Sequence, residues 1–477
     1  MLAVCGFLAM FLMIGLRAPI GLAMLLVGSC GYMILSSPVA LFSYMKTNAY
    51  HQFANYTLSV IPLFILMGAI AERAGIASQL FKVAERSFRK RRGGLAMAVI
   101  GSCTAFGAIC GSSVATTATF GRAALPELLK ARYDGGLATA TIAVGGTLGI
   151  LIPPSVILVV YAITTEQNIA KLFQAALVPG LLAALLYILT IAIVVRRNPD
   201  LAPVAEEDAN IRPSAKPLWP KLAAACSLVL VATQVWRGAL DWEQAVLFGV
   251  VAAMIAMADV AIMPVIAIAV IVVGGIYGGV FTPTEGAAVG VIAMLAVGLL
   301  GGKLTFREIL VTLRQTAETS GMIFLILLGA EVFGAFLALS QLPSQAAQMI
   351  SGTGLPPLAV LSMMLVFYIL LGAIMDELAM ILLTLPLFFP VIQALDFGMP
   401  PDEAAIWFGV LVLMVVGIGL TAPPVGLNVF VISSLARQIP ILSIYKGVLP
   451  FLLSDILRVL LVLIFPGTAL WLVRFFN

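Results

Sequence analysis

Charged side chains are scarce in this sequence. Lysine, arginine, aspartate and glutamate together make up 10% of the 477 residues, whereas hydrophobic residues make up 62%. A soluble domain carries about 25% charged residues, so this composition excludes a large aqueous globule. The formal net charge is +4, and the basic residues are scattered at loop positions instead of gathering on one face. We therefore expect no nucleic-acid partner.

Residues that commonly carry catalysis or bind transition metals are also few. His51 is the only histidine and lies in a polar stretch, so a proton relay built on histidine is excluded. The five cysteines form no CxxC pair and no cluster with histidine, and we expect them to be small buried side chains. HExxH, GxSxG and the phosphate-binding P-loop are missing. The sequence therefore predicts no enzyme and no cofactor, and ATP cannot drive the chain directly.

Apolar stretches, in contrast, recur from one end of the chain to the other. Each is about 15 to 25 residues long, which is the length that a membrane-spanning helix needs. The alternating pattern of barrel strands is not seen. The first charge, Arg17, follows the first apolar run, so we expect residues 2–36 to be membrane helix and not a signal peptide. The chain is predicted to be an all-α polytopic membrane protein.

Two apolar stretches are interrupted by adjacent prolines. "GTLGILIPPSVILVVYAI" (146–163) contains Pro153 and Pro154, and "GIGLTAPPVGLNVFVISS" (417–434) contains Pro423 and Pro424. Proline removes a backbone donor, and in lipid every backbone polar group needs a partner. Such a break is tolerated where it lines a cavity enclosed by protein or filled with water. We therefore predict broken helices at 137–165 and 405–437.

The basic residues predict how the segments are oriented. The basic stretch 82–94 is typical of an amphipathic helix at the cytoplasmic surface. Residues 93–130 must then enter and leave on one side, which predicts a re-entrant hairpin with its tip near 111–117. The second half runs in the opposite sense, with a hairpin at 357–394 that enters from outside and has its tip near 372–380.

The two halves also resemble each other in sequence. "PLFILMGA" (62–69) is similar to "IFLILLGA" (323–330), and the proline pairs follow in the same order. This pattern predicts two repeats that are inverted in the membrane. The predicted divisions are N-terminal scaffold helices (1–60), a first repeat (61–195), a cytoplasmic linker (196–221), additional helices with the FTPTE motif (222–302) and a second repeat (303–471).

The tip of the first hairpin offers uncharged oxygens to a cation. Gly111 permits a tight turn, and the hydroxyls belong to Ser112, Ser113, Thr116 and Thr117. Sodium is bound by several oxygens, many of them carbonyls of unwound helix. Facing the tip we expect Thr147, Gly149, Pro153, Pro154 and Ser155. Packing of small residues and a proline kink without a ligand are the alternative interpretations.

The tip of the second hairpin carries Asp376 and Glu377. An ionisable group at this depth is costly and is a candidate for function. Asp376 could bind a cation or orient a substrate hydroxyl, or it could cap the following helix. Opposite this tip we expect Thr421, Pro423, Pro424 and Asn428.

Arg122 and Glu285 each allow two interpretations. Arg122, in the descending arm of the first hairpin, could contact substrate or extend to the cytoplasmic face. Glu285 follows Thr282 in the order of a capping box, so "TPTE" (282–285) is either a helix cap or part of a gate.

Several of these motifs together resemble one family. They are "IPLFILMGAIAERAGI", "GSSVATTAT", "GTLGILIPPSVILVVYAI", "GIYGGVFTPTEGAAVG", "MDELAMILLTLPLFFPVI" and "GIGLTAPPVGLNVFV", and they cover residues 61–431. The chain resembles the large membrane (DctM-like) subunit of tripartite ATP-independent periplasmic (TRAP) transporters, and the motifs occur in that family's order.

This resemblance implies a sodium-driven importer of small organic acids, such as C4-dicarboxylates or sialic acid, in the bacterial inner membrane. It implies an elevator mechanism, in which a transport domain carrying both hairpins slides against a scaffold. It also implies a soluble periplasmic substrate-binding protein and a small four-helix (DctQ-like) membrane subunit as partners.

The resemblance also implies two sodium sites and a substrate site. The first sodium cluster would be Ser112, Ser113, Thr147, Gly149 and Pro153, and the second would be Asp376, Gly417, Thr421, Pro423 and Asn428. The substrate candidates are Thr116, Ser155, Asp376 and Arg122. Sodium is the only metal expected.

One segment departs from the family pattern. Residues 222–236 and 244–258 are predicted to form an extra helical pair before the FTPTE motif. Two other functions stay open: a stand-alone sodium–dicarboxylate symporter that needs no binding protein, and an intramembrane enzyme using Asp376 or the serines. The enzyme is disfavoured because no second aspartate or histidine is placed to assist.

Overall fold

The chain folds entirely into helices and turns in its described part. The structure is a computed structural model that describes residues 2–88, 91–203, 263–352 and 354–476. Within these ranges there is no strand, and seven helices are long and apolar enough to cross a membrane. A bent pair of helices would make eight. The predicted all-α polytopic membrane protein is confirmed.

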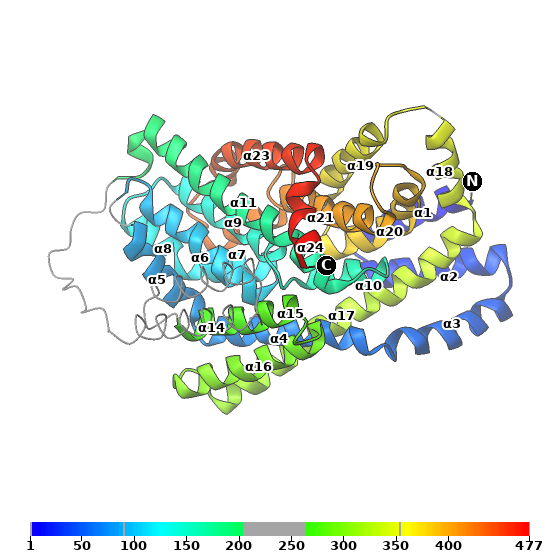
Figure 1. Cartoon of the computed structure of the whole chain (residues 1–477), viewed down its shortest axis with the longest axis horizontal. Coiled ribbons are helices and arrows are strands. Elements are labelled where there is room, and N and C mark those ends of the chain that lie inside the picture. The colour runs from blue at the N-terminus through cyan, green and yellow to red at the C-terminus, as the bar shows by residue number, and fades with distance from the viewer. Residues whose placement is uncertain (1, 89–90, 204–262, 353, 477) are drawn as a thin grey trace, which may run out of the picture.

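The first half contains eleven described helices (Figure 1). They are α1 (Leu2–Gly15), α2 (Ile20–Leu35), α3 (Pro38–Phe53), α4 (Val60–Arg73), α5 (Ile76–Phe88), α6 (Gly94–Cys110), α7 (Ser113–Ala123), α8 (Leu125–Lys130), α9 (Gly135–Leu151), α10 (Val156–Thr164) and α11 (Ile169–Arg197).

The described part of the second half begins at residue 263. Its helices are α14 (Met263–Ala269), α15 (Gly275–Tyr277), α16 (Pro283–Leu300), α17 (Phe306–Leu339), α18 (Leu342–Gly352), α19 (Pro357–Gly372), α20 (Glu377–Ala394), α21 (Pro401–Gly419), α22 (Leu427–Leu435), α23 (Ile441–Ile464) and α24 (Gly467–Phe476).

The N-terminal apolar stretch is not one helix. Residues 2–36 form α1 and α2, with a turn in which Arg17 has a φ of 68°. A charged residue in this left-handed conformation ends α1, and Pro19 precedes α2. Cys5 and Cys30 on these two helices are exposed, whereas Cys103 and Cys110 are buried. The expectation of buried cysteines is thus correct for the second pair only, because part of the surface of α1 and α2 is not covered by other helices.

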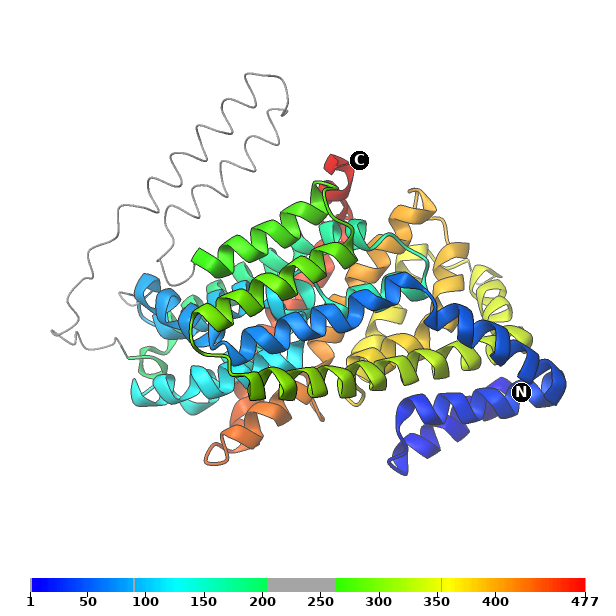
Figure 2. The same cartoon turned by 90° about the horizontal axis from the view of Figure 1, so that it is seen from below.

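Helix α17 joins two segments that the sequence suggested were separate. The expected amphipathic segment at 303–314 and the expected crossing at 320–340 form one helix, which begins with a capping box between Thr305 and Glu308. It packs along α2, where a Cβ on Gly28 would lie 2.7 Å from the backbone of Phe333. Glycine permits such close approach of two backbones. In Figure 2, α17 (yellow-green) and α4 (blue) run side by side along one face.

Two helical hairpins approach each other from opposite ends of the molecule. Helices α6 and α7 lie toward the left of Figure 1, and α19 and α20 lie toward the right. In their tips, at 111–112 and 373–376, Gly111, Ala373 and Met375 are buried, whereas Ile374 is exposed. The amphipathic helix expected near 82–94 is α5, which buries Ile76, Leu80 and Phe81. Inverted orientation in the membrane and the domain boundaries stay predictions.

Two predicted segments lie wholly or mostly outside the described residues. The extra helical pair at 222–258 and most of the linker at 196–221 lie outside the described residues. The first part of the linker continues α11 to Arg197 and then forms a short 3₁₀ turn, Pro199–Leu201.

Candidate functional site

The first hairpin tip is a tight turn between two helices. Helix α6 ends at Gly111, whose φ of 63° lies in the left-handed region that favours glycine. Ser112 then caps α7: its side chain accepts a hydrogen bond from the Ala115 amide at 3.4 Å. The Thr116 hydroxyl donates to the Ser112 carbonyl at 2.7 Å. The turn therefore lies within the stretch that the sequence singled out.

The first broken helix consists of α9 and α10, which are bent by 43°. The four residues between them include Pro153 and Pro154, which are joined by a cis peptide bond, as are Pro423 and Pro424. Proline supplies no backbone N–H, so the α9 carbonyls near the break lose their helical donors. Unwound backbone thus lies in the buried interior.

The hairpin tip lies directly against this break. A Cβ on Gly149 would lie 2.6 Å from both the Ser112 carbonyl oxygen and Thr116 Oγ1, and a Cβ on Gly111 would lie 2.9 Å from the Pro154 carbonyl oxygen. These distances leave no room for a side chain at either glycine. The structure thus brings Ser112 and Gly149 of the first predicted cluster together, beside the substrate candidate Thr116.

The second tip is built in a similar way. Helix α19 ends at Gly372, and Asp376 caps α20 by accepting a hydrogen bond from the Leu378 amide at 3.2 Å. A Cβ on Gly419 would lie 2.6 Å from the Gly372 carbonyl carbon. The Gly426 amide donates to the Ala373 carbonyl at 3.3 Å. Asp376 therefore has the capping role that was one of its two interpretations.

The two halves meet at their broken helices. Asn428, expected in the second cluster, donates from Nδ2 to Ser113 Oγ at 2.7 Å and to the Ala143 carbonyl at 3.0 Å. A Cβ on Gly417 would lie 3.6 Å from Thr147 Cβ. Asn428, Gly417 and Thr147 therefore connect the two predicted clusters.

Several oxygens in this region are buried without a hydrogen-bond partner. They are Thr117 Oγ1, Ser155 Oγ, Glu377 Oε2 and Asn428 Oδ1. Leaving a buried acceptor unpaired costs about 1–3 kcal/mol, so such atoms call for an explanation. No group of three or more His, Cys, Asp or Glu that could hold a metal is found among the described residues. The hydroxyl and amide oxygens among them, together with the Glu377 carboxyl oxygen, fit a small hard cation such as sodium.

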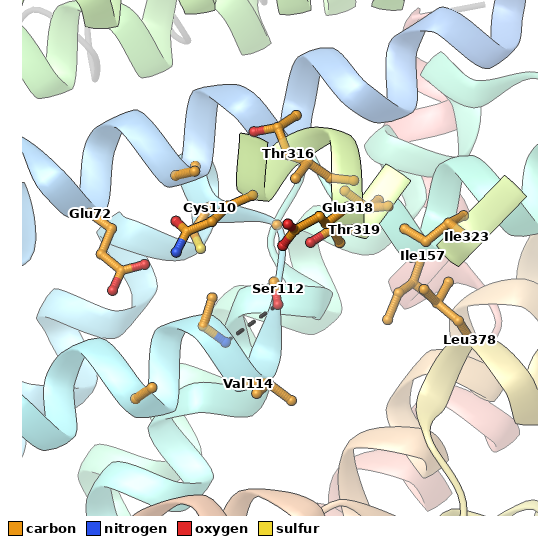
Figure 3. A pocket seen from close by; sticks show the side chains of 18 of the residues that line it. Glu72, Cys110, Ser112, Val114, Ile157, Thr316, Glu318, Thr319, Ile323 and Leu378 are labelled. Atoms are coloured by element: carbon orange, nitrogen blue, oxygen red, sulfur yellow. Dashed lines mark hydrogen bonds between the residues drawn. The ribbon is translucent and has the colours of Figure 1, made fainter. Parts of the chain in front are cut away.

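A cavity of about 450 Å³ opens beside the first tip. Figure 3 shows Ser112 of the tip together with Thr316, Glu318 and Thr319 of α17. The cavity is lined by Ile65, Gly68, Ala69 and Glu72 of α4, by Cys110, Gly111, Ser112, Val114, Ala115 and Ala118 of the first hairpin, by Val156 and Ile157, by Gln315, Thr316, Glu318, Thr319 and Ile323 of α17, and by Glu377 and Leu378.

None of the four substrate candidates is among the residues that line this cavity. Arg122 forms an ion pair with Glu72, which does line it, and both side chains are partly exposed. Sequence reasoning missed the polar residues of α17, because they lie on a long helix with no break or motif. Only their position opposite a hairpin tip marks them.

A second cavity, of about 580 Å³, lies at the other end of α17. It is lined by His51 and Gln52 of α3, by Asn55 after that helix, by the end of α10, by α20 and by residues 327–338 of α17. The first cavity uses residues 315–323 of the same helix. Each cavity therefore lies between α17 and one of the two hairpins.

Thr282 and Glu285 form a complete capping box at the start of α16. The Thr282 amide donates to Glu285 Oε2 at 2.8 Å, and the Glu285 amide donates to Thr282 Oγ1 at 3.3 Å. The interpretation of "TPTE" as a helix cap is confirmed, because each side chain satisfies a free donor of the first turn.

The fold and the site together define the class of the protein. It is a multi-pass helical membrane protein in which two hairpins meet two broken helices. The crystal structure of the YdaH transporter of Alcanivorax borkumensis has a similar fold, with a TM-score of 0.60 at 15% identity, over 90% of this chain and 89% of that one.

The family follows from the sequence comparisons. A family model described as "Tripartite ATP-independent periplasmic transporter, DctM component" matches residues 7–468. The chain belongs to this family of large transport permeases, which are multi-pass inner-membrane proteins and not enzymes. The resemblance seen in the motifs is confirmed.

Relatives that are named for different substrates match most of the chain. The C4-dicarboxylate TRAP transporter large permease DctM of Pseudomonas aeruginosa is 32% identical, over 87% of this chain and 86% of its own length. The isethionate TRAP permease DctMQ of Oleidesulfovibrio alaskensis is 29% identical over 96% of this chain, which spans only 64% of that protein. The sialic acid TRAP permease SiaM of Vibrio cholerae is 28% identical, over 88% and 87%.

Proposed function

We propose that this permease imports a small organic acid anion and that a sodium gradient drives the import. The observation that carries the proposal is the set of buried, unpartnered oxygens where the hairpin tips meet the broken helices. Two of them, Thr117 Oγ1 and Asn428 Oδ1, belong to different halves of the chain, so a cation between them would hold the halves together. C4-dicarboxylates, sialic acid and isethionate, which appear in the names of relatives, are organic acids.

The proposed sodium sites follow the two clusters. Ser112, Ser113, Thr147, Gly149 and Pro153 form the first, and Asp376, Gly417, Thr421, Pro423 and Asn428 form the second. The proximity of Asn428 to Ser113 supports cooperation between the two sites. The substrate site would adjoin the tips, with Thr116, Ser155, Asp376 and Arg122 as the candidates.

We further propose an elevator mechanism. The first cavity borders the first hairpin and the second borders α20 of the second hairpin, and both have a wall made by α17. If the hairpins and broken helices slide along α17 as one unit, one cavity closes while the other opens. Helix α17 packs on α2 and α4, and these three helices would belong to the static scaffold.

The proposed partners are a soluble periplasmic binding protein and a small four-helix membrane subunit. The name of the DctMQ relative combines the two membrane components, which supports a small subunit for this family. The binding protein would deliver substrate to the outer side, where the second cavity lies in the predicted orientation.

Uptake into proteoliposomes tests this function. The chain would be reconstituted with a co-encoded small subunit, and labelled succinate or sialic acid would be added with the matching binding protein. An inward sodium gradient should drive accumulation, and replacing sodium with potassium should abolish it. Accumulation that does not depend on the sodium gradient would refute the proposed coupling. Uptake in the absence of the binding protein would favour the stand-alone symporter.

A further inference from the structure

The last long helix contains a buried ion pair that the sequence did not mark. On α23, Arg458 Nη2 lies 2.7 Å from Asp455 Oδ1, and the two side chains are 1% and 2% exposed. Desolvating two charges costs several kcal/mol per ion, so a buried pair is weak evidence for a stabilising role. An ionisable pair inside a membrane segment instead suggests function.

The pair is connected to the first half of the chain by a tyrosine. The Tyr187 hydroxyl on α11 donates to Asp455 Oδ1 at 2.8 Å and approaches Oδ2 at 2.9 Å. The same hydroxyl lies 3.3 Å from Thr147 Oγ1. Arg458, Asp455, Tyr187 and Thr147 thus form one continuous polar chain that ends at the first cation cluster.

At the Arg458 end of this polar network, two hydrogen-bond donors lack partners. Arg458 Nε and Nη1 are buried and have no hydrogen-bond partner. If the network served stability alone, an apolar side chain of similar size would serve at least as well. The network instead places a fixed, oriented hydroxyl beside Thr147.

The network lies where equivalent positions of the two halves meet. Tyr187 and Arg458 are equally spaced from the internal prolines of their helices, Pro179 and Pro450. Thr147 and Gly417 are likewise equally spaced from the two proline pairs and lie in contact. Only the first half therefore supplies a hydroxyl at this contact.

Thr147 needs to be held in one orientation to serve as a cation ligand. Its hydroxyl donates to the Val144 carbonyl at 2.7 Å, and the Tyr187 oxygen, whose own proton goes to Asp455, lies 3.3 Å from the same Thr147 Oγ1. Threonine can rotate between two side-chain orientations in a helix. Two polar neighbours select one of them.

We propose that Tyr187, held by Asp455 and Arg458, is a positioning residue that fixes Thr147 in the first sodium site. This inference rests on the proposed sodium coupling. Partners behind a metal ligand commonly change metal affinity by 10–100-fold when they are removed. Loss of the Tyr187 hydroxyl should therefore weaken sodium binding without changing the set of ligands.

The test is a sodium titration of the purified full-length chain in detergent. The thermal unfolding temperature would be followed as sodium chloride replaces choline chloride at constant ionic strength, and the midpoint gives the apparent sodium affinity. Tyr187→Phe should raise this midpoint about tenfold. Thr147→Val should raise it as well, and the double variant should show no further increase, because both changes act on the same ligand.

A matched control separates positioning from a general loss of a buried hydroxyl. Tyr368 is also fully buried, and its hydroxyl lies 2.6 Å from Thr384 Oγ1 inside the second hairpin. Tyr368→Phe should leave the sodium midpoint unchanged. If Tyr187→Phe does not fold, Asp455→Asn is the second variant. It weakens the hydrogen bond that orients Tyr187, so it should also raise the sodium midpoint.

The outcomes are distinguishable. A Tyr187→Phe protein with the wild-type midpoint, or an equal shift in the Tyr368→Phe control, overturns the positioning role while sodium binding itself stands. A wild-type chain that shows no sodium-dependent stabilisation refutes the proposed coupling, and the inference with it.

Discussion

At the scale of residues, glycine and small polar side chains decide how closely the backbone segments approach. Gly149 permits the first hairpin tip to lie against the first break, and Gly419 does the same for the second. The hydroxyls and amides between them donate to some backbone carbonyls, while several side-chain oxygens are left unpartnered. In the proposed cation site, such unpaired oxygens would serve as ligands without a cluster of acidic residues.

Gly149→Ala tests this close approach. The added methyl group would lie 2.6 Å from Ser112 O and Thr116 Oγ1, so the tip must shift away from the break. Overpacking of this kind costs about 1–3 kcal/mol. We expect sodium-dependent uptake to fall at least about tenfold. Gly274→Ala is the control, because a Cβ there meets no atom within 4 Å; normal uptake by Gly149→Ala would contradict the geometry.

Asp376 allows its capping role to be separated from a role in transport. Asparagine caps helices as well as aspartate does, so Asp376→Asn should keep the unfolding temperature near that of the wild type. If the carboxylate binds a cation or substrate, uptake should nevertheless be lost. Asp376→Ala should lose uptake and also about 1 kcal/mol of stability. Full uptake by the asparagine variant would leave Asp376 as a cap only.

At the scale of elements, the hairpins are connected to the remaining helices by few polar contacts. Arg122 on α7 pairs with Glu72 on α4, beside the first cavity. If α7 moves with the transport unit and α4 stays with the scaffold, this pair must break during each cycle. An exposed ion pair contributes about 0–1 kcal/mol, so it can break readily.

Charge reversal tests this contact between elements. Glu72→Arg or Arg122→Glu alone places like charges together, and we expect each to lower the uptake rate several-fold with little effect on the unfolding temperature. The double reversal should restore the rate. Arg314→Glu, at an exposed pair with Glu318 within α17, is the control. Failure of the double reversal to recover would exclude a role for the pair.

At the scale of the whole molecule, two hairpins with opposite directions meet two broken helices. Gly111 and Ser112 of the first tip and the start of α20 line the first cavity, and both cavities have a wall from α17. The long capped helix therefore offers one continuous surface along which the rest could move. This arrangement requires that the two hairpins enter the membrane from opposite sides.

Cysteine labelling tests that orientation. In a background without the native cysteines, Lys130→Cys at the end of α8 and Asp396→Cys after α20 both place a thiol at an exposed position. A membrane-impermeant maleimide should react with residue 396 in intact cells and with residue 130 only after the membrane is opened. Labelling of both from the same side would refute the inverted repeats.

The sequence by itself determined the features that depend on local backbone chemistry. Proline pairs predicted both breaks, Gly111 predicted a turn, and the TPTE motif predicted a cap, because each residue acts on its own few neighbours. The long apolar runs determined the membrane class for the same reason. The extent of α17 was missed because its first turns are polar although they continue the same helix.

Only the tertiary structure decided which distant residues touch. Asn428 was assigned to the second cluster, yet its amide lies against Ser113 of the first. Tyr187 and Asp455 belong to different halves, and nothing in either helix alone marks their contact. A hydrogen bond needs atoms within about 3 Å, and that distance is set by how whole helices pack, which no short stretch of sequence contains.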